Sequence, residues 1–439
     1  MPEPRTGPVV RSTTDAYDES MLRALYRSAS LRTAAVMALG GVGFSLGSLL
    51  LARVLPTDEY GLVALVLGIV AVAGLTAPLG LDQIAARRGV RLDERWRRGA
   101  LIACATTASA AAIIAALAYH LSISLAVGVA FITLAIGLAQ SAGGHFQGRQ
   151  QLRTAVWVVQ LLNGSLALAA LLALALHLTT ASAVCALLGA LAMLAAAGIW
   201  WLVRRRQGAR ERQLRPWELR FEAVSLLAVQ SGNSAFLQLE RLLIGPLLGL
   251  HDLAVYSVLA ALVSSPFRLL QSALQFTLIP TLRVAGDARA RRARVVRESA
   301  LVFLTVAAGS VAIWVLAPPL ARWLTAGRYD ISHFLIAACL ASGFLKVLSG
   351  MLTAVVVSCG EGRRLRILSV VCWGSIGVSV AGAYLSGTWG LAWVIYGIAT
   401  GWLTRCLLTA YLALPYLRPQ LESASPPPPG RARLHSSSR

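Results

Sequence analysis

The chain contains a series of apolar runs, each long enough to form a helix that crosses a lipid bilayer. A spanning helix needs roughly 20 mostly apolar residues. Charged residues make up only 13% of the chain, against about 25% in a typical soluble domain. These features predict an all-α integral membrane protein. About twelve transmembrane helices are expected, at residues 31–54, 60–84, 99–119, 121–142, 154–176, 181–203, 223–248, 252–281, 299–320, 331–357, 367–386 and 389–415.

Arginine clusters lie between these runs and orient them, because short basic loops stay on the cytoplasmic side. Every even-numbered connection is basic, and the odd-numbered ones are short and poor in arginine apart from Arg322 and Arg328. Both termini are therefore predicted to be cytoplasmic, and the net charge of +21 comes from loops, so no nucleic acid is expected as a partner. The basic connections carry Arg87, Arg88, Arg91, Arg95, Arg97 and Arg98, then Arg149 and Arg153, then Arg204, Arg205, Arg206, Arg210, Arg212, Arg215 and Arg220, then Arg283, Arg289, Arg291, Arg292, Arg294 and Arg297, and finally Arg363, Arg364 and Arg366.

A short internal repeat suggests that the chain has two similar halves. Residues 55–66 read LPTDEYGLVALV and residues 248–259 read LGLHDLAVYSVL, and a basic loop follows each at nearly the same offset. We expect two parallel six-helix bundles related by a pseudo-two-fold axis along the membrane normal. Chance similarity between two short apolar turns is the alternative.

The expected organisation follows from the apolar runs and the basic loops. Residues 1–30 are predicted to be a cytoplasmic segment without a signal peptide, because they are polar and the first apolar run is long enough to span. The two bundles cover residues 31–203 and 223–415, and a basic cytoplasmic linker, 204–222, joins them. Residues 416–439 form a tail rich in proline and serine that is expected to be disordered; its arginines could contact anionic lipids.

Polar side chains form stripes on several predicted helices. A charge at bilayer depth costs about 2.5–3.5 kcal/mol on insertion scales, so such residues should face water or a partner. On the helix at 252–281, Ser264, Arg268, Gln271 and Gln275 fall at i, i+4, i+7 and i+11 and so share one face, and Pro266 could kink the helix beside Arg268.

The same pattern recurs on other helices and defines a candidate cavity. One hypothesis is that the cations line a wet cavity between the bundles, suited to an anionic group such as a diphosphate; the other is that they only join helices by hydrogen bonds. Glu240 could pair with an arginine or carry a proton, and it lies about 100° from Arg241 on the helical wheel. The candidate cavity residues are Arg241, Arg268, Lys346, Arg405, Glu240, Gln271, Gln275, Gln230, Asn233, Arg32 and Asp82, the last two near helix ends.

The sequence contains no pattern that indicates a metal, a cofactor or a catalytic group. The six cysteines form no C-x-x-C pair and lie mostly inside apolar runs, where we expect them to pack as small residues. No H-E-x-x-H spacing is present among the histidines, and no G-x-x-x-x-G-K-[ST] loop occurs, so ATP is not expected to be the direct driver. We expect a transporter rather than an enzyme.

Two segments resemble the polysaccharide flippases of the multidrug, oligosaccharidyl-lipid and polysaccharide exporter superfamily. They are residues 44–89, which contain the turn ARVLPTDEYG, and residues 237–282, their counterpart in the second half. The resemblance implies a flippase of the bacterial cytoplasmic membrane that moves undecaprenyl diphosphate-linked oligosaccharides through a cationic cavity by alternating access. It also implies H⁺ or Na⁺ as a coupling ion and contact with polysaccharide-assembly proteins. That family often has an aspartate before the basic residue of the seventh helix; here Glu240 precedes Arg241, which leaves a coupling role for this carboxylate open.

Three other classes of transporter or enzyme are alternatives to the flippase family. A small-molecule or drug exporter of the same superfamily is the nearest alternative. A major facilitator transporter would need G-x-x-x-D-R-x-G-R-R, which the segment GLDQIAARRG at residues 80–89 does not match. A membrane glycan polymerase or ligase would need a sizeable outward loop, and none longer than roughly a dozen residues follows from the positive-inside assignment.

Overall fold

The computed structural model describes residues 29–88, 94–149, 151–205, 220–268, 288–359 and 362–417, together with 270–271, 274, 278 and 282. Within these residues the chain is almost entirely helical and has no strand, which confirms the predicted all-α class. The first half contains α2 (Ala29–Val54), α3 (Thr57–Thr76), α4 (Leu81–Arg88), α5 (Glu94–Ala118), α6 (Ile123–Gly148), α7 (Leu152–Val159), α8 (Leu161–Ala175) and α9 (Ala181–Arg205). The second contains α10 (Arg220–Leu248), α11 (Leu250–Leu259), the π-helix η2 (Ala260–Ser264), α13 (Ala288–Leu324), α14 (His333–Cys359), α15 (Gly362–Ser386), the 3₁₀ turn η3 (Gly387–Trp389) and α16 (Leu391–Leu417).

The number of spanning helices agrees with the sequence prediction. Nine helices among the described residues are long and apolar enough to cross a membrane, and the bent pair α7–α8 makes a tenth. The remaining two are α2, whose apolar part runs over Leu39–Val54, and α10. We attribute the absence of α10 from the apolar set to the polar residues along it, Gln230, Asn233, Glu240 and Arg241 among them.

Three predicted helices differ in detail from the observed ones. The helix expected at 60–84 ends at Thr76, and a turn with positive φ at Leu79 (50°) and Gly80 (82°) leads into the short α4. The helix expected at 154–176 is bent by 49° between α7 and α8. In the helix expected at 252–281, the π-helical turn η2 comes just before Pro266. The hydropathy of the sequence predicts the length of an apolar run, and it does not predict a turn, a bend or a π-helical turn within that run.

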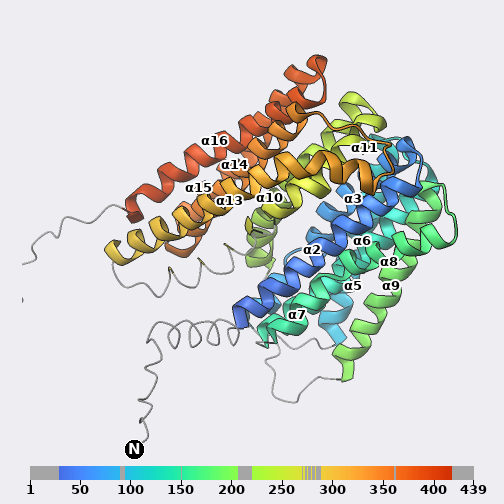
Figure 1. The fold of residues 1–439 in the computed structure, drawn as a ribbon. Helices are drawn as coiled ribbons and strands as arrows, with labels where there is room; N and C mark the ends of the chain where they lie inside the picture. Colours follow the sequence, from blue (N-terminus) through green and yellow to red (C-terminus); the bar gives the residue numbers. More distant parts are fainter. Residues whose placement is uncertain are drawn as a thin grey trace, which may run out of the picture.

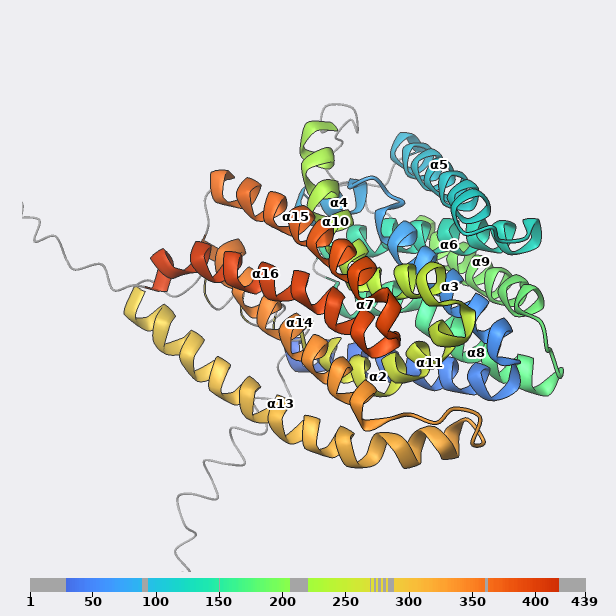
Figure 2. The ribbon, with the colours of Figure 1, turned by 90° about the horizontal axis from the view of Figure 1, so that it is seen from above.

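The helices form two groups with α10 and α11 between them. In Figure 1, α13, α14, α15 and α16 lie together on one side, and α2 and α5–α9 lie together on the other. Figure 2, viewed from above, shows the same separation, with α10, α11 and α3 near the centre. Helices α10 and α11 both pack against α3. This arrangement agrees with two parallel bundles whose first two helices meet at their interface.

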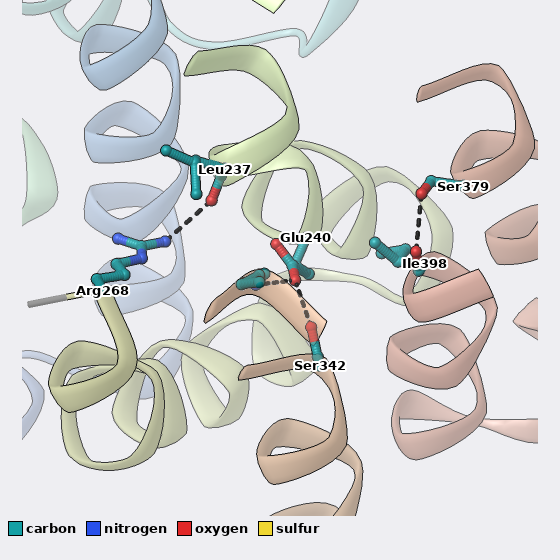
Figure 3. Close-up of polar contacts among 7 residues, drawn as sticks. Leu237, Glu240, Arg268, Ser342, Ser379 and Ile398 are labelled. Atoms are coloured by element: carbon teal, nitrogen blue, oxygen red, sulfur yellow. Dashed lines mark hydrogen bonds and ion pairs between the residues drawn. The ribbon is translucent and has the colours of Figure 1, made fainter. Parts of the chain in front are cut away.

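Close packing of small residues joins neighbouring helices inside each bundle, as is common in membranes. Helices α15 and α16 approach so closely that a Cβ at Gly382 would lie 2.3 Å from the carbonyl oxygen of Gly397. The hydroxyl of Ser379 donates a hydrogen bond of 2.7 Å to the carbonyl oxygen of Ile398 across the same contact (Figure 3). These contacts fix α15 and α16 as one rigid pair.

One end of the molecule carries the arginine-poor connections, and we call it the arginine-poor end. The bundles touch there. The guanidinium of Arg328, between α13 and α14, donates a hydrogen bond of 2.8 Å to the carbonyl oxygen of Leu55 in the first bundle. The ring of Tyr329 packs edge-on against Tyr60, with centroids 6.3 Å apart. The other arginine of this end, Arg322, pairs with Asp330 at 3.0 Å. Both exceptions in the arginine pattern therefore have local partners.

Candidate functional site

Neighbouring residues Glu240 and Arg241 on α10 point to different bundles. The carboxylate of Glu240 forms an ion pair with the ammonium of Lys346 on α14 and accepts a hydrogen bond of 3.2 Å from the hydroxyl of Ser342 (Figure 3). Arg241 instead lies against the first bundle, where its guanidinium carbon is 5.3 Å from the ring centre of Phe44 on α2. The separation follows from the angle of about 100° between successive residues of a helix.

Arg241 is a buried cation that forms no ion pair with the residues that the structure describes. Its side chain is only 2% exposed, and its Nε atom has no hydrogen-bond partner within the part of the chain that the structure describes. No carboxylate of a described residue forms an ion pair with it either. Gly68 on α3 makes the close approach possible, because a Cβ there would lie 3.0 Å from the Cβ of Arg241. A buried guanidinium left in this state is costly unless water or a ligand supplies acceptors.

Arg268 reaches the same region from the second bundle. It follows η2 and Pro266, and it is half-buried. One of its terminal nitrogens donates a hydrogen bond of 3.0 Å to the carbonyl oxygen of Leu237 on α10 (Figure 3). Its Nε atom has no partner among the described residues. A single carbonyl satisfies only part of a guanidinium with five N–H donors.

Arg241 and Arg268 line one cavity between the bundles. Its volume is about 340 Å³, within the range of about 300–1,000 Å³ that is usual for ligand sites. The first bundle contributes the other wall, and the hydroxyl of Ser45 there donates a hydrogen bond of 2.8 Å to Ser265 across the interface. The lining residues are Gly41, Phe44, Ala71, Val159, Gln160, Leu162, Asn163, Gln238, Arg241, Ala260, Ser265 and Arg268. The site is thus cationic on one side and amide-rich on the other.

Lys346 and Arg405, two of the predicted cavity cations, do not line this cavity. Lys346 is 2% exposed and is paired with Glu240 inside the second bundle. The guanidinium of Arg405 on α16 donates hydrogen bonds of 3.3 and 3.4 Å to the side-chain oxygen of Asn233 on α10. Arg405 also lies near the stacked rings of Phe236 and Trp402, with its guanidinium carbon 5.7 and 5.4 Å from their centres. These contacts join α10 to α14 and α16.

The other predicted site residues lie at several places in the fold. Gln271 is buried against Gly350 of α14, and Gln230 is half-buried on α10. Asp82, on α4, is buried and accepts a hydrogen bond of 3.1 Å from the amide of Gln83. Arg32 belongs to α2 near its first turn. Gln275 lies outside the described residues.

Sequence reasoning missed the amides that face the two arginines. Gln160 and Asn163 line the cavity from the first bundle, at the bend between α7 and α8. Both are polar residues in an otherwise apolar stretch, VVQLLNG at residues 158–164, which was a usable signal.

A second cavity, of about 580 Å³, lies between the bundles towards the arginine-poor end. It is separated from the first cavity along α10. Gln238 and Arg241 of this helix line the first cavity, and Gly245 and Pro246 line the second. The two cavities also meet different parts of α3, Ala71 at the first cavity and Leu62 and Leu65 at the second. The lining residues of the second cavity are Leu62, Leu65, Ala118, Tyr119, His120, Leu121, Ser122, Leu125, Gly245, Pro246, Gly249 and Leu250.

Comparison with solved structures shows the fold. An inward-facing multidrug resistance MATE family transporter of the MOP superfamily superimposes with a TM-score of 0.62 at 16% identity, over 86% of this chain and 94% of that one. An outward-facing multidrug resistance MATE family transporter of the MOP superfamily superimposes with a TM-score of 0.57 at 16% identity, over 90% of this chain and 97% of that one. A MATE structure in a bent conformation gives 0.56 at 17% identity, over 88% and 94%.

Sequence comparison identifies the family. No curated protein matches the chain. The family model described as "Polysaccharide biosynthesis protein" matches residues 50–332, which include α3, Glu240, Arg241 and all the residues that line the first cavity except Gly41 and Phe44. The chain therefore belongs to this family of polysaccharide biosynthesis proteins, and it has the membrane-transporter fold of the MOP superfamily.

Proposed function

We propose that this protein is a flippase that moves an undecaprenyl diphosphate-linked oligosaccharide or polysaccharide precursor across a bacterial cytoplasmic membrane. The single observation that supports this most directly is the buried Arg241, which has no ion-pair partner among the described residues and lies beside Arg268 in a cavity between the bundles. Guanidinium groups bind phosphate oxygens in bidentate geometry. A diphosphate would supply the acceptors that the described protein groups do not. The polysaccharide biosynthesis family of this chain supports the same cargo.

In this proposal the two bundles, residues 31–203 and 223–415, move relative to each other, and no covalent chemistry takes place. Two cavities lie at different levels of α10, one lined by Gln238 and Arg241 and the other by Gly245 and Pro246. Opening one while closing the other would expose Arg241 to each side of the membrane in turn, which is the alternating-access mechanism of such folds. Polysaccharide-assembly proteins and surrounding lipids are the partners that this function implies.

The coupling ion in this proposal is H⁺ or Na⁺. One candidate carrier, Glu240, forms an ion pair with Lys346. Its second carboxylate oxygen, Oε2, has no hydrogen-bond partner in the described part of the chain. That free oxygen supports Glu240 as the group to test first for ion dependence of transport.

A drug exporter is the second candidate, since the superimposed structures include multidrug resistance transporters. The charge of the cavity favours the flippase over an exporter of cationic drugs, because two guanidinium groups repel a cation. Binding of an anionic lipid and of a cationic dye by the same purified protein separates these functions.

The experiment compares Arg241→Gln and Arg268→Gln with Arg205→Gln as a matched control. Arg205 is an exposed arginine on α9 that does not line the cavity. Its guanidinium carbon lies 3.7 Å from the ring centre of Trp201. Purified protein in nanodiscs is titrated with undecaprenyl diphosphate, and cells depleted of the native protein are examined for accumulated lipid-linked glycan. We expect the two cavity variants to bind at least tenfold more weakly and to fail in complementation, while the control behaves like the wild type.

Normal binding and normal transport by Arg241→Gln would contradict the proposal. Arg241→Lys provides a further check, because it keeps the charge and removes the bidentate geometry. We expect intermediate affinity for this variant. The glycan that accumulates on depletion identifies the cargo directly.

A further inference from the structure

The bend between α7 and α8 holds a pair of amide side chains at the cavity. Gln160 is the junction residue, ending α7 and preceding α8. The side-chain nitrogen of Asn163, in the first turn of α8, donates a hydrogen bond to the side-chain oxygen of Gln160. We call these two residues the amide pair. The bend of 49° gives the amide pair its position on the cavity wall that the first bundle contributes.

Glycines of α2 make room for the amide pair. A Cβ at Gly40 would lie 2.4 Å from the Oε1 atom of Gln160, a separation that real side chains do not tolerate. Gly43 faces the next turn, where a Cβ would lie 3.9 Å from the backbone oxygen of Asn163. The Gln160 side chain therefore packs directly on α2 at Gly40, and a methyl group added there would displace it.

The hydrogen bond within the amide pair leaves one whole NH₂ group and one whole carbonyl oxygen unused. Gln160 retains its NH₂ group and Asn163 retains its carbonyl oxygen; neither bonds to another residue in the described ranges. A third amide, Gln238 on α10, also lines the cavity and has an Oε1 atom without a partner among described residues. If these residues only joined helices, their groups would be paired with one another or with the backbone. They are instead available to a ligand.

The chemistry of this wall differs from that of the arginines. Neutral amides can both donate hydrogen bonds to hydroxyl and acetamido groups and accept hydrogen bonds from them. Guanidinium groups, which only donate, favour phosphate. The two kinds of wall enclose one space of about 340 Å³, which lies near the lower limit for ligand sites. A space of this size admits a diphosphate and the adjoining part of a glycan, and it does not admit a whole oligosaccharide.

We infer that the amide pair, with Gln238, recognises the first sugar residue attached to the diphosphate and so sets the glycan specificity of the transporter. This inference rests on the proposed function, since it assigns the diphosphate to Arg241 and Arg268. Sugars farther along the chain make no contact with this wall. Selectivity is therefore expected to depend on the hydroxyl and acetamido pattern of that first residue.

The test uses two probes with purified protein in nanodiscs: undecaprenyl diphosphate, and the same lipid carrying one N-acetylhexosamine. Wild-type protein should bind the glycosylated probe more tightly. Gln160→Leu and Asn163→Leu, which keep similar side-chain volume, should weaken binding of the glycosylated probe about 2- to 10-fold, as for the loss of one or two hydrogen bonds. Their affinity for the bare diphosphate should stay within twofold of wild type.

Two further variants separate recognition from folding. Gly40→Ala leaves both amides in the sequence but displaces Gln160, so it should weaken binding of the glycosylated probe selectively as well. Gly164→Ala is the matched control, because a Cβ there meets nothing within 4 Å, and it should bind both probes normally. Where Gln160→Leu does not insert, Gln160→Asn retains the amide but shortens its reach, and it should show the same selective loss.

The outcomes distinguish this inference from the proposed function. Equal affinity of wild type for the two probes, or equal losses for both probes in the amide variants, would overturn the sugar assignment. Arg241→Gln should weaken the binding of both probes by the same factor. Unchanged binding of bare diphosphate by Arg241→Gln, together with a selective loss in the amide variants, would overturn the anion site and leave the amide wall supported.

Discussion

Lys346 on α14 forms an ion pair with Glu240 on α10, and the two residues are only 2% and 1% exposed. The pair lies inside the second bundle, where Ser342 donates a hydrogen bond to the same carboxylate oxygen (Figure 3). A charge at bilayer depth requires a partner, and each of these residues neutralises the other. The pair therefore allows α10 to carry the carboxylate next to Arg241.

Replacing one member of the Glu240–Lys346 pair should destabilise the second bundle strongly. Glu240→Gln or Lys346→Met leaves the other charge buried and unpaired, which costs about 3–5 kcal/mol in comparable pairs. The double variant should recover most of this loss, because it removes both charges. Thermal unfolding of the detergent-solubilised protein measures the effect. Ser342→Ala, which loses one hydrogen bond, serves as the mild control; single variants as stable as this control would show that the pair contributes little.

Removing the Arg328 side chain should loosen the closed interface at the arginine-poor end. The Arg328→Ala variant loses the hydrogen bond that the guanidinium donates to the carbonyl oxygen of Leu55 in the first bundle. We expect a cysteine placed at Leu62, which lines the adjacent cavity, to react several-fold faster with a membrane-impermeant maleimide. Arg322→Ala is the control, because Arg322 pairs with Asp330 on its own side. Identical labelling rates in both variants would mean that Arg328 does not hold the bundles together.

Adding a methyl group at Gly61 should prevent the bundles from closing at the same end. A Cβ at this position would lie 2.3 Å from the carbonyl oxygen of Leu250 on α11, and backbone atoms cannot move aside as a flexible side chain can. Gly61→Ala should therefore favour conformations in which α3 and α11 are apart, and it should increase labelling at position 62. Gly164→Ala, with open space around it, should leave labelling unchanged. A wild-type rate in Gly61→Ala would contradict the close contact.

The orientation of the chain can be tested by reporter fusion. Basic connections are retained in the cytoplasm, and the even number of spans returns the C-terminus to the side of the N-terminus. A reporter fused after Arg439 should be active only in a cytoplasmic assay. Activity of a periplasmic reporter at this position would require an odd number of spans or the opposite orientation.

Much of the fold could be predicted from the sequence, because each spanning helix satisfies its own backbone hydrogen bonds and is marked by its own apolar length. The breaks could not. The bend at Gln160 and the π-helical turn before Pro266 depend on how α7, α8 and η2 pack against α2 and α14. The predicted stripe on the eighth helix does bring Arg268 to the interface, but Gln271 on the same stripe packs against Gly350 of α14.

The sequence by itself determined that this protein lies in a membrane, which ends of its helices are basic, and that α10 carries Glu240 and Arg241 on different faces. Only the tertiary structure decided which cations share a cavity. Arg241 and Arg268 line the same cavity between the bundles. Within the second bundle, Lys346 forms an ion pair with Glu240, and Arg405 donates a hydrogen bond to Asn233. The helical period gives the direction in which a side chain points, and it contains no information about which neighbouring helix stands there.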